Sequence, residues 1–200
     1  MIARDGGHVI FYYQMTNCDL LQYELFHAMR IGFLYLAAGH GMYAIHSASL
    51  LYQGQAWLFS GPSGTGKSTH TNLWNRCYGT PILNGDLNLL ARQNAHPVIC
   101  GIPWCGTSGI CETDIRPLGG ITLLRQDRTN RIYPLSEDQK LLGIQQRMIS
   151  PFWTGDMLLS ALSFIESILP EISVYRLGCT VSEEAADVMK HAIDYDLQSR

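Results

Sequence analysis

The sequence predicts one α/β domain, because strand-like apolar runs alternate along the chain with stretches in which apolar residues recur at helical spacing. A chain of 200 residues is long enough to bury a hydrophobic core. It contains no internal repeat, no low-complexity segment and no linker-like run. We therefore expect residues 1–200 to form a single domain, with an N-terminal strand and helix in 1–40, a central core in 41–126, and helices with a strand in 127–200.

The first 60 residues are expected to contain a strand, a helix and a hairpin. HVIFYY (8–13) is a short strand candidate, and ELFHAMRIGFLYLAAG (24–39) carries apolar residues at helical spacing. Two β-like runs follow, at 42–52 and 55–60, and the dipeptide Gln53-Gly54 separates them. A two-residue connection that contains glycine predicts a tight hairpin.

The remainder of the chain alternates in the same way. A short helix is expected at 67–79, followed by strand, turn and strand at 81–92. Two further strands are expected at 117–126 and 130–135, linked by the polar turn DRT. The C-terminal third is expected to contain a helix that begins with a Ser-x-x-Gln capping pattern (136–149), an amphipathic helix (156–169), a strand (172–177) and a closing helix with a serine cap (182–193).

Composition narrows the range of partners. The formal net charge is -3 and no run of Lys or Arg is present, which argues against a nucleic-acid partner, since such binding needs a concentrated basic face. The longest apolar stretch, IGFLYLAAGHGMYAI, is interrupted by glycine and histidine, and no signal peptide is visible. We therefore expect a cytoplasmic protein without a membrane partner.

Charged residues make up 16% of the chain, against about 25% in typical soluble domains. This low fraction favours a homo-oligomer whose subunits cover part of the surface.

Six cysteines are present, and in a cytoplasmic chain we expect them to be reduced thiols. Cys100, Cys105 and Cys111 lie close together in the sequence, but their spacing matches no zinc pattern, and no histidine stands beside them at ligand spacing. We interpret them as buried or loop thiols rather than as metal ligands.

The most informative stretch is GPSGTGKS, which matches the phosphate-loop pattern G-x-x-x-x-G-K-[ST] at every fixed position. Glycines let the backbone curl so that successive N–H groups point at phosphate oxygens, and the following helix adds its dipole. We expect Lys67 to reach the β- and γ-phosphates of a nucleotide, and to pack against nothing when the loop is empty. The Ser68 hydroxyl is expected to bind Mg²⁺. The nucleotide-binding residues are then Gly61, Pro62, Ser63, Gly64, Thr65, Gly66, Lys67, Ser68 and Thr69.

His46 is the second candidate site residue. If the Gln53-Gly54 turn sets the hairpin register, Tyr52 faces Gln55 and, six pairs further, His46 faces Gly61. An imidazole then lies at the foot of the phosphate loop. A histidine in an apolar strand is more often a core residue, so the register is the observation that favours a functional role.

These motifs resemble a known catalytic core. IHSASLLYQGQAWLFSGPSGTGKSTHTNLW followed by PILNGDLNLL is similar to the core shared by HPr kinase/phosphorylase and ATP-dependent phosphoenolpyruvate carboxykinase. GIPWCG (101–106) resembles a G-x-P-W-C-G stretch of the HPr-kinase-related proteins found beside peptide-modifying systems. The resemblance covers residues 40–126 with specific motifs, and it implies a mixed β-sheet phosphate-loop core with flanking helices.

The resemblance also implies phosphoryl transfer and assigns roles to residues. In carboxykinases the histidine before the loop and the second residue of an acidic pair face the catalytic metal, which implies His46 and Asp86 here, with Ser68 and Asp86 as ligands to Mg²⁺. An arginine in the corresponding region of both families approaches the transferred phosphate, and Arg116 in CETDIRPLGGI is the candidate. The equal alternative for Arg116 is a solvated charge at a strand end.

One position departs from the families. They show two adjacent acidic residues, and here the pair is Gly85-Asp86. Either Asp86 serves alone, or His46 acts as the base, or the protein binds nucleotide without efficient turnover. Glu112 is a further candidate for the missing base, and Trp104 either stacks on a ligand or packs as a lid.

The predicted function is an ATP-dependent kinase that transfers the γ-phosphoryl group to a hydroxyl acceptor, either a serine or threonine of a peptide or protein, or a small molecule. His46, Lys67, Asp86 and Arg116 are its expected catalytic residues, and ATP and Mg²⁺ its cofactors, with adenine favoured by the resemblance alone. Carboxykinase activity is not expected, because the chain is too short for the additional domain that supplies that family's substrate-binding arginines. The alternative is a nucleotide-binding regulatory module with little or no turnover.

Overall fold

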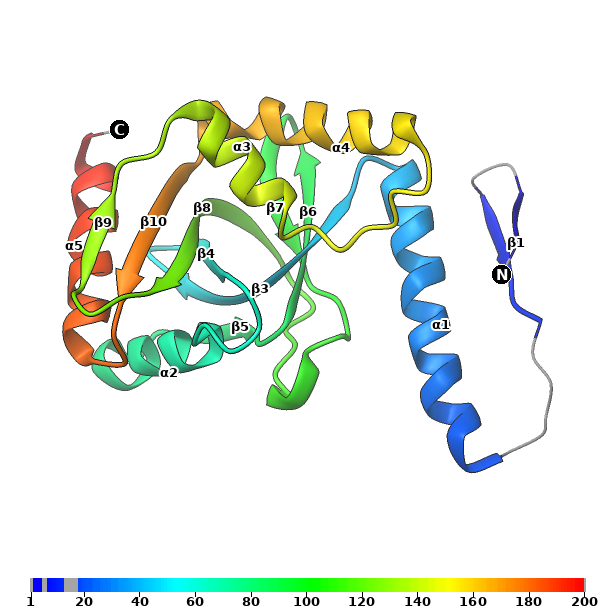
Figure 1. Cartoon of the computed structure of the whole chain (residues 1–200), viewed down its shortest axis with the longest axis horizontal. Coiled ribbons are helices and arrows are strands. Elements are labelled where there is room, and N and C mark those ends of the chain that lie inside the picture. The colour runs from blue at the N-terminus through cyan, green and yellow to red at the C-terminus, as the bar shows by residue number, and fades with distance from the viewer. Residues whose placement is uncertain (1, 5–6, 13–17, 200) are drawn as a thin grey trace.

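The computed structural model describes residues 2–4, 7–12 and 18–199. It is a mixed α/β structure built around an eight-stranded sheet (Figure 1). The strands of the sheet are β3 (Tyr43–Tyr52), β4 (Gln55–Ser60), β5 (Ile82–Asn84), β6 (Leu87–Gln93), β7 (His96–Cys100), β8 (Ile115–Gln126), β9 (Arg131–Tyr133) and β10 (Ser173–Cys179). The helices are α1 (Cys18–Gly39), α2 (Lys67–Tyr78), α3 (Glu137–Gln145), α4 (Gly155–Ile168) and α5 (Glu183–Ser199), with short 3-10 turns η1 (Gly106–Ser108) and η2 (Leu169–Glu171).

The sheet is mixed and curves back on itself. β8 runs parallel to both β4 and β10, whereas the other neighbouring strands of the sheet are antiparallel. β3 pairs with β6 through its first residues and with β4 through its last, and β8 pairs with β7 through its first residues and with β4 further along. The strands β4, β3, β6, β7 and β8 therefore form a closed ring.

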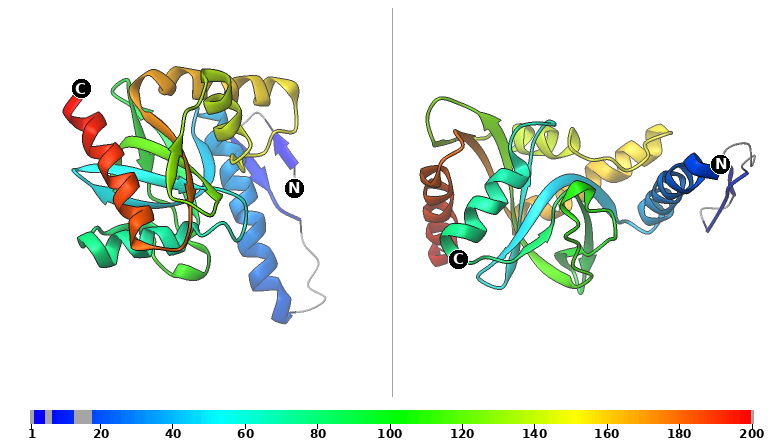
Figure 2. Two further views of the ribbon diagram at one scale, coloured as in Figure 1. Left: turned by 60° about the vertical axis from the view of Figure 1, so that its left-hand side comes forward. Right: turned by 90° about the horizontal axis from the view of Figure 1, so that it is seen from below.

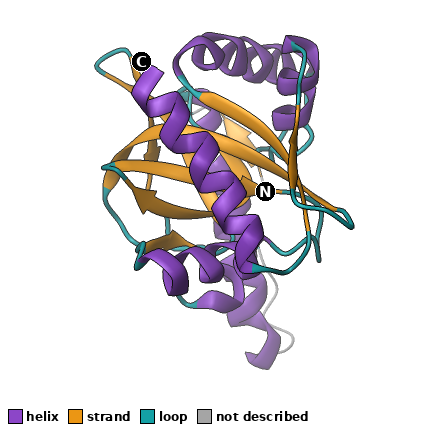
Figure 3. Ribbon diagram, turned by 90° about the vertical axis from the view of Figure 1, so that its left-hand side faces the viewer, coloured by secondary structure: helices purple, strands orange, loops and turns teal. Residues whose placement is uncertain are grey.

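Helices cover the two faces of β4, because its side chains point alternately to opposite sides. Ala56 and Leu58 lie in a buried cluster with residues of α3 and α4, and Trp57 and Phe59 lie in another with residues of α2 and α5. Figure 3 shows α5 crossing in front of the sheet. The strand that leads into the phosphate loop is thus buried on both sides.

The N-terminal elements lie at one end of the molecule, and α5 lies at the opposite end (Figures 1 and 2). β1 (Ile2–Arg4) and β2 (His8–Ile10) form a separate antiparallel pair. α1 packs Leu34 and Ala37 into a third buried cluster with residues of β3, of β6 and of the loop after β7. The strand predicted at 8–13 is confirmed over His8–Ile10, and residue 13 lies outside the described residues.

Local signals account for most of these elements. The β3–β4 turn places Gln53 and Gly54 at φ 51° and 75°, the left-handed pair that a two-residue hairpin requires. α2 ends at Gly79, whose φ of 66° lets its N–H bond to the carbonyl of Asn75. The capping box predicted for α3 is formed by Ser136 and its partner Gln139.

Two features of the sheet differ from the sequence-based expectation. β7 was not predicted; it forms a hairpin with β6 through Asn94 and Ala95, which adopt positive φ without glycine. β8 and β9 are strands as predicted, but they are not neighbours, because β10 inserts between them and pairs with both. Within the residues that the structure describes, no helix is both long enough and apolar enough to span a membrane.

Candidate functional site

The loop from Gly61 to Gly66 leads from the end of β4 into α2. Gly64 and Gly66 adopt φ values of 77° and 97°, which L residues with side chains rarely adopt, so these glycines allow the backbone to curl. No side chain caps the N-terminus of α2, and its first turn contains no acidic residue. The first N–H groups of α2 are therefore available to an anion, as in phosphate-binding loops.

Lys67, the first residue of α2, folds back over the loop. Its Nζ donates hydrogen bonds to the carbonyls of Gly61 at 3.1 Å and Pro62 at 3.3 Å. The side chain is buried, which corrects the expectation that it packs against nothing. Burial is the main cause that lowers the pKa of Lys67; the charge of Arg147 lowers it further, and the charge of Asp86 raises it.

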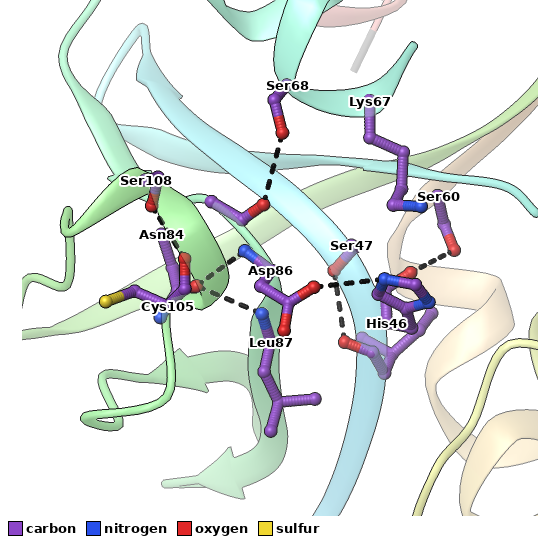
Figure 4. A network of polar contacts seen from close by, with 12 residues as sticks. His46, Ser47, Ser60, Lys67, Ser68, Asn84, Asp86, Leu87, Cys105 and Ser108 are labelled. Atoms are coloured by element: carbon purple, nitrogen blue, oxygen red, sulfur yellow. Dashed lines mark hydrogen bonds and ion pairs between the residues drawn. The ribbon is translucent and has the colours of Figure 1, made fainter. Parts of the chain in front are cut away.

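His46 and Asp86 form a hydrogen-bonded pair near the loop, with 3.1 Å between His46 Nε2 and Asp86 Oδ1 (Figure 4). The hairpin register is as predicted from Tyr52–Gln55 to Ser47–Ser60, but it does not extend to the predicted pair of His46 and Gly61, because His46 pairs with Leu87 of β6. The Ser60 hydroxyl donates to the His46 carbonyl at 2.7 Å, so the last residue of β4 holds the backbone of the histidine.

Asp86 is held by an Asx turn. Asn84 Oδ1 accepts the N–H groups of Asp86 at 2.9 Å and Leu87 at 3.0 Å, which fixes the bend between β5 and β6 (Figure 4). The Asp86 carbonyl also accepts the N–H of Ser47 at 3.0 Å, which ties the bend to β3. The histidine and the carboxylate are therefore positioned by backbone contacts on neighbouring strands.

The environment keeps the Asp86 carboxyl ionised. The hydrogen bond from His46 is the main cause that lowers its pKa, and the positive charges of His46, Lys67 and Arg30 act in the same direction, against burial. An ionised carboxylate can hold a cation or accept a proton, and here it lies within the field of the phosphate-loop lysine.

Ser68 and Asp86 provide the oxygen ligands that suit Mg²⁺. The Ser68 hydroxyl points at the Gly85 carbonyl, 3.4 Å away, in the peptide unit just before Asp86 (Figure 4). No group of three or more His, Cys, Asp and Glu side chains that could hold a metal occurs among the described residues. A hydroxyl and one carboxylate nevertheless fit Mg²⁺, which takes few protein ligands and completes its shell with phosphate oxygens and water.

The position of the missing carboxylate is filled by a neighbouring turn. A Cβ built on Gly85 would lie 2.2 Å from Ser108 Oγ and 3.3 Å from the Cys105 carbonyl oxygen. Ser108 belongs to η1, and its hydroxyl donates to Cys105 O at 2.7 Å. No side chain fits at position 85 unless this turn moves.

Arg116, the predicted phosphate-binding arginine, contacts a neighbouring carboxylate instead of the loop. The Arg116 guanidinium pairs with Asp114 at 2.5 Å, and its described polar contacts do not include the loop, so its role at the phosphate stays a prediction. Glu112 is exposed and lines the same small pocket as Arg116.

Trp104 is buried, with its ring centroid 5.9 Å from that of Phe26 and 5.2 Å from that of Phe33 on α1. This packing agrees with the lid interpretation of Trp104.

Arg147, which sequence reasoning missed, lies beside the site. Its carbonyl accepts the His46 N–H at 2.9 Å, and its charge acts on Lys67. It follows α3 in a segment without any motif, so only the long-range pairing of that segment with β3, at Ile45–Met148, brings it here.

Comparisons with known proteins add one likeness. No protein-family model and no curated protein sequence matches the chain. Among solved structures, the HPr(Ser) kinase/phosphatase from Coxiella burnetii is similar, with 13% sequence identity and a TM-score of 0.42 over 78% of this chain and 97% of that one. This is a distant relationship at the level of the overall fold.

Proposed function

We propose that this protein is an ATP-dependent kinase that transfers the γ-phosphoryl group to a hydroxyl acceptor, either a serine or threonine of a peptide or protein, or a small molecule. The observation that carries the proposal is the contact of His46 Nε2 with the Asp86 carboxylate, 3.1 Å apart, in the field of Lys67. An ionised, half-buried carboxylate such as Asp86 near a buried lysine such as Lys67 is unusual in a loop that binds nothing, whereas a phosphoryl-transfer site uses both groups.

In this proposed reaction each site residue has a separate role. The loop N–H groups and Lys67 bind the phosphates, and Lys67 exchanges its carbonyl partners for phosphate oxygens. Ser68 and Asp86 would hold Mg²⁺, which supplies charge neutralisation at the phosphates. Asp86 or His46 takes the proton of the acceptor hydroxyl, and the contact of 3.1 Å between His46 Nε2 and Asp86 Oδ1 lets the two groups act as one unit.

The second candidate function is a nucleotide-binding regulatory module, which the closed position 85 favours. Without a second carboxylate, a single group must both hold the cation and accept the proton. A protein of this kind binds ATP tightly but turns it over slowly, if at all.

One experiment separates the two functions. The protein is incubated with Mg-ATP and a panel of hydroxyl acceptors, including Ser/Thr peptides and small alcohols, and the phosphorylated products are followed by mass spectrometry while ADP is measured. Steady ADP production that depends on an acceptor supports the kinase. Bound ATP that is retained without ADP production supports the module, and no ATP binding contradicts both.

A further inference from the structure

Two cavities flank the phosphate loop, and Thr65 lines both of them. The larger has a volume of about 390 Å³ and lies between Pro62 and Thr65 of the loop, the end of β8, the segment around Arg147, and Arg176 of β10; we call it the arginine cavity. The smaller has a volume of about 130 Å³ and lies between the loop, α2 and the residues after β10; we call it the helix cavity.

The arginine cavity carries uncompensated positive charge. Arg125, Arg147 and Arg176 line it, and no Asp or Glu does. Arg125 is 3.8 Å from Asp127, but among the described residues neither Arg147 nor Arg176 has a carboxylate oxygen within 4.0 Å. Arg147 Nε is buried and finds no acceptor within the part of the chain that is described. Buried donors are normally paired, so this one indicates a missing partner.

The helix cavity has the opposite character. It is lined by uncharged residues of the loop, by α2 residues such as Thr69 and Leu73, and by the segment from Cys179 to Val181. Its one ionisable ring, His70, has a pKa lowered by burial to about 4 and is neutral. A neutral nucleoside suits this side of the loop, and an anion suits the other.

Arg147 connects the arginine cavity to the strand that carries His46. The Arg147 carbonyl accepts the His46 N–H at 2.9 Å, while the Arg147 side chain lines the cavity. An anion that is held by this guanidinium lies on the side of the loop where the segment after α3 bonds to β3, the strand that carries His46.

We propose that the arginine cavity binds an anionic group, a carboxylate or a phosphate, of the hydroxyl acceptor. Guanidinium groups present paired donors that match the oxygens of these anions and remain charged at all accessible pH values. The acceptor class is then a hydroxyl compound or peptide that carries a negative charge near the hydroxyl. The proposal rests on the kinase function proposed above, and it narrows the acceptor to acidic molecules.

The test uses citrate as the probe and the whole chain saturated with ADP in the absence of Mg²⁺, because citrate chelates this cation; the affinity for Mg-ADP is measured separately, without citrate. Isothermal titration calorimetry is expected to show citrate binding that Arg176→Gln weakens at least about tenfold, the size of one lost charge-assisted hydrogen bond. Arg176→Lys should restore part of it, and the exposed Arg128→Gln, which lines neither cavity, should leave it unchanged. The affinity for Mg-ADP itself should be the same in all of these proteins.

Three results overturn the proposal: no citrate binding to the wild type, citrate binding that Arg176→Gln leaves intact, or a Mg-ADP affinity that falls together with citrate binding in Arg176→Gln. The last result would assign the cavity to the nucleotide. If Mg-ADP does not bind at all, the proposed kinase function fails, and citrate titration of the nucleotide-free protein still tests the cavity.

Discussion

Ser108 Oγ lies 2.2 Å from the position that a Cβ on Gly85 would occupy, and Ser108 Cβ lies 2.5 Å from it. The turn η1 can therefore pack against the bend before Asp86 only because position 85 has no side chain. The absence of a side chain at position 85 is linked in this way to the structure of a loop more than 20 residues further along the chain.

We expect Gly85→Ala to lower the free energy of unfolding by about 1–3 kcal/mol, the usual cost of overpacking. Ser108→Gly opens the space, so the double variant should lose less stability than the sum of the single variants. Gly155→Ala is the matched control, because a Cβ there meets nothing within 4 Å. Urea unfolding of the four proteins measures the coupling, and strict additivity of the two changes would contradict the steric account.

Lys67→Ala should weaken ATP binding by about 2–3 kcal/mol, the contribution of a charged hydrogen-bonding group to its phosphates. The variant also loses the bonds from Nζ to Gly61 and Pro62, so its thermal stability is measured alongside. Lys140→Ala, which removes an exposed pair with Glu137, is the control. Calorimetry with ATP decides: equal affinity in Lys67→Ala and wild type would remove the phosphate-loop assignment.

Asp86→Asn is expected to keep nucleotide binding and to lower turnover by orders of magnitude, because the amide neither holds a cation well nor accepts a proton. His46→Ala should lower turnover by about 10²–10⁴-fold if the imidazole is the acid–base group. Since the two side chains contact each other at 3.1 Å, their effects should be far from additive. Initial rates of ADP formation for both single variants and the double variant test this; a fully active Asp86→Asn would refute the mechanism.

Local chemistry explains why part of this site could be predicted. The Gln53-Gly54 turn fixes the register of two adjacent strands as far as the pair Ser47–Ser60, one residue short of His46, and His46 itself pairs with Leu87 of β6. The bend that carries Asp86 is also formed by local contacts, because Asn84 Oδ1 accepts hydrogen bonds from the backbone N–H groups two and three residues further along the chain. The phosphate-loop pattern likewise predicts strand, loop and helix at the observed residues.

Long-range pairing explains what could not be predicted. Arg147 reaches the site because its segment bonds to β3, and Ser108 fills position 85 because the loop after β7 folds back; neither contact leaves a periodic pattern in the sequence. The insertion of β10 between β8 and β9 and the closure of the strand ring also depend on pairing between distant segments, parallel for β8 with β10 and β4 and antiparallel for β9 with β10. Arg116 was assigned by analogy, and in the structure it pairs with its near neighbour Asp114.

His70 makes stability depend on pH. Burial lowers its pKa from 6.5 to about 4, and the ring accepts a hydrogen bond from Trp74 Nε1 at 3.2 Å. The unfolded chain therefore binds a proton more readily than the folded one, so stability is full above pH 6.5 and is lost as the pH falls toward 4. This amounts to up to about 3 kcal/mol. His70→Gln keeps an acceptor for Trp74 but does not titrate, and its unfolding free energy should fall less over the same range; identical pH profiles would contradict the assignment.

The cysteines are expected to be free thiols without metal. Burial is the main cause that raises the pKa of Cys105, and a hydrogen bond with Cys111 adds to it, so the Cys105 thiol is protonated near neutral pH. Elemental analysis of protein purified without added metal should show no zinc, and iodoacetamide should modify Cys105 more slowly than it modifies free glutathione. Stoichiometric zinc would overturn this interpretation.

The closed strand ring has a consequence for synthesis on the ribosome. β4 pairs with β3 as soon as the hairpin emerges, but its parallel neighbour β8 is complete only when the chain has been made as far as Gln126. At about 5–20 residues per second, the nascent hairpin spends seconds without that partner. During this interval Trp57 and Phe59, which are fully buried in the finished protein, have no helix α5 to cover them. The half-made chain therefore presents an aromatic surface of the kind that chaperones bind.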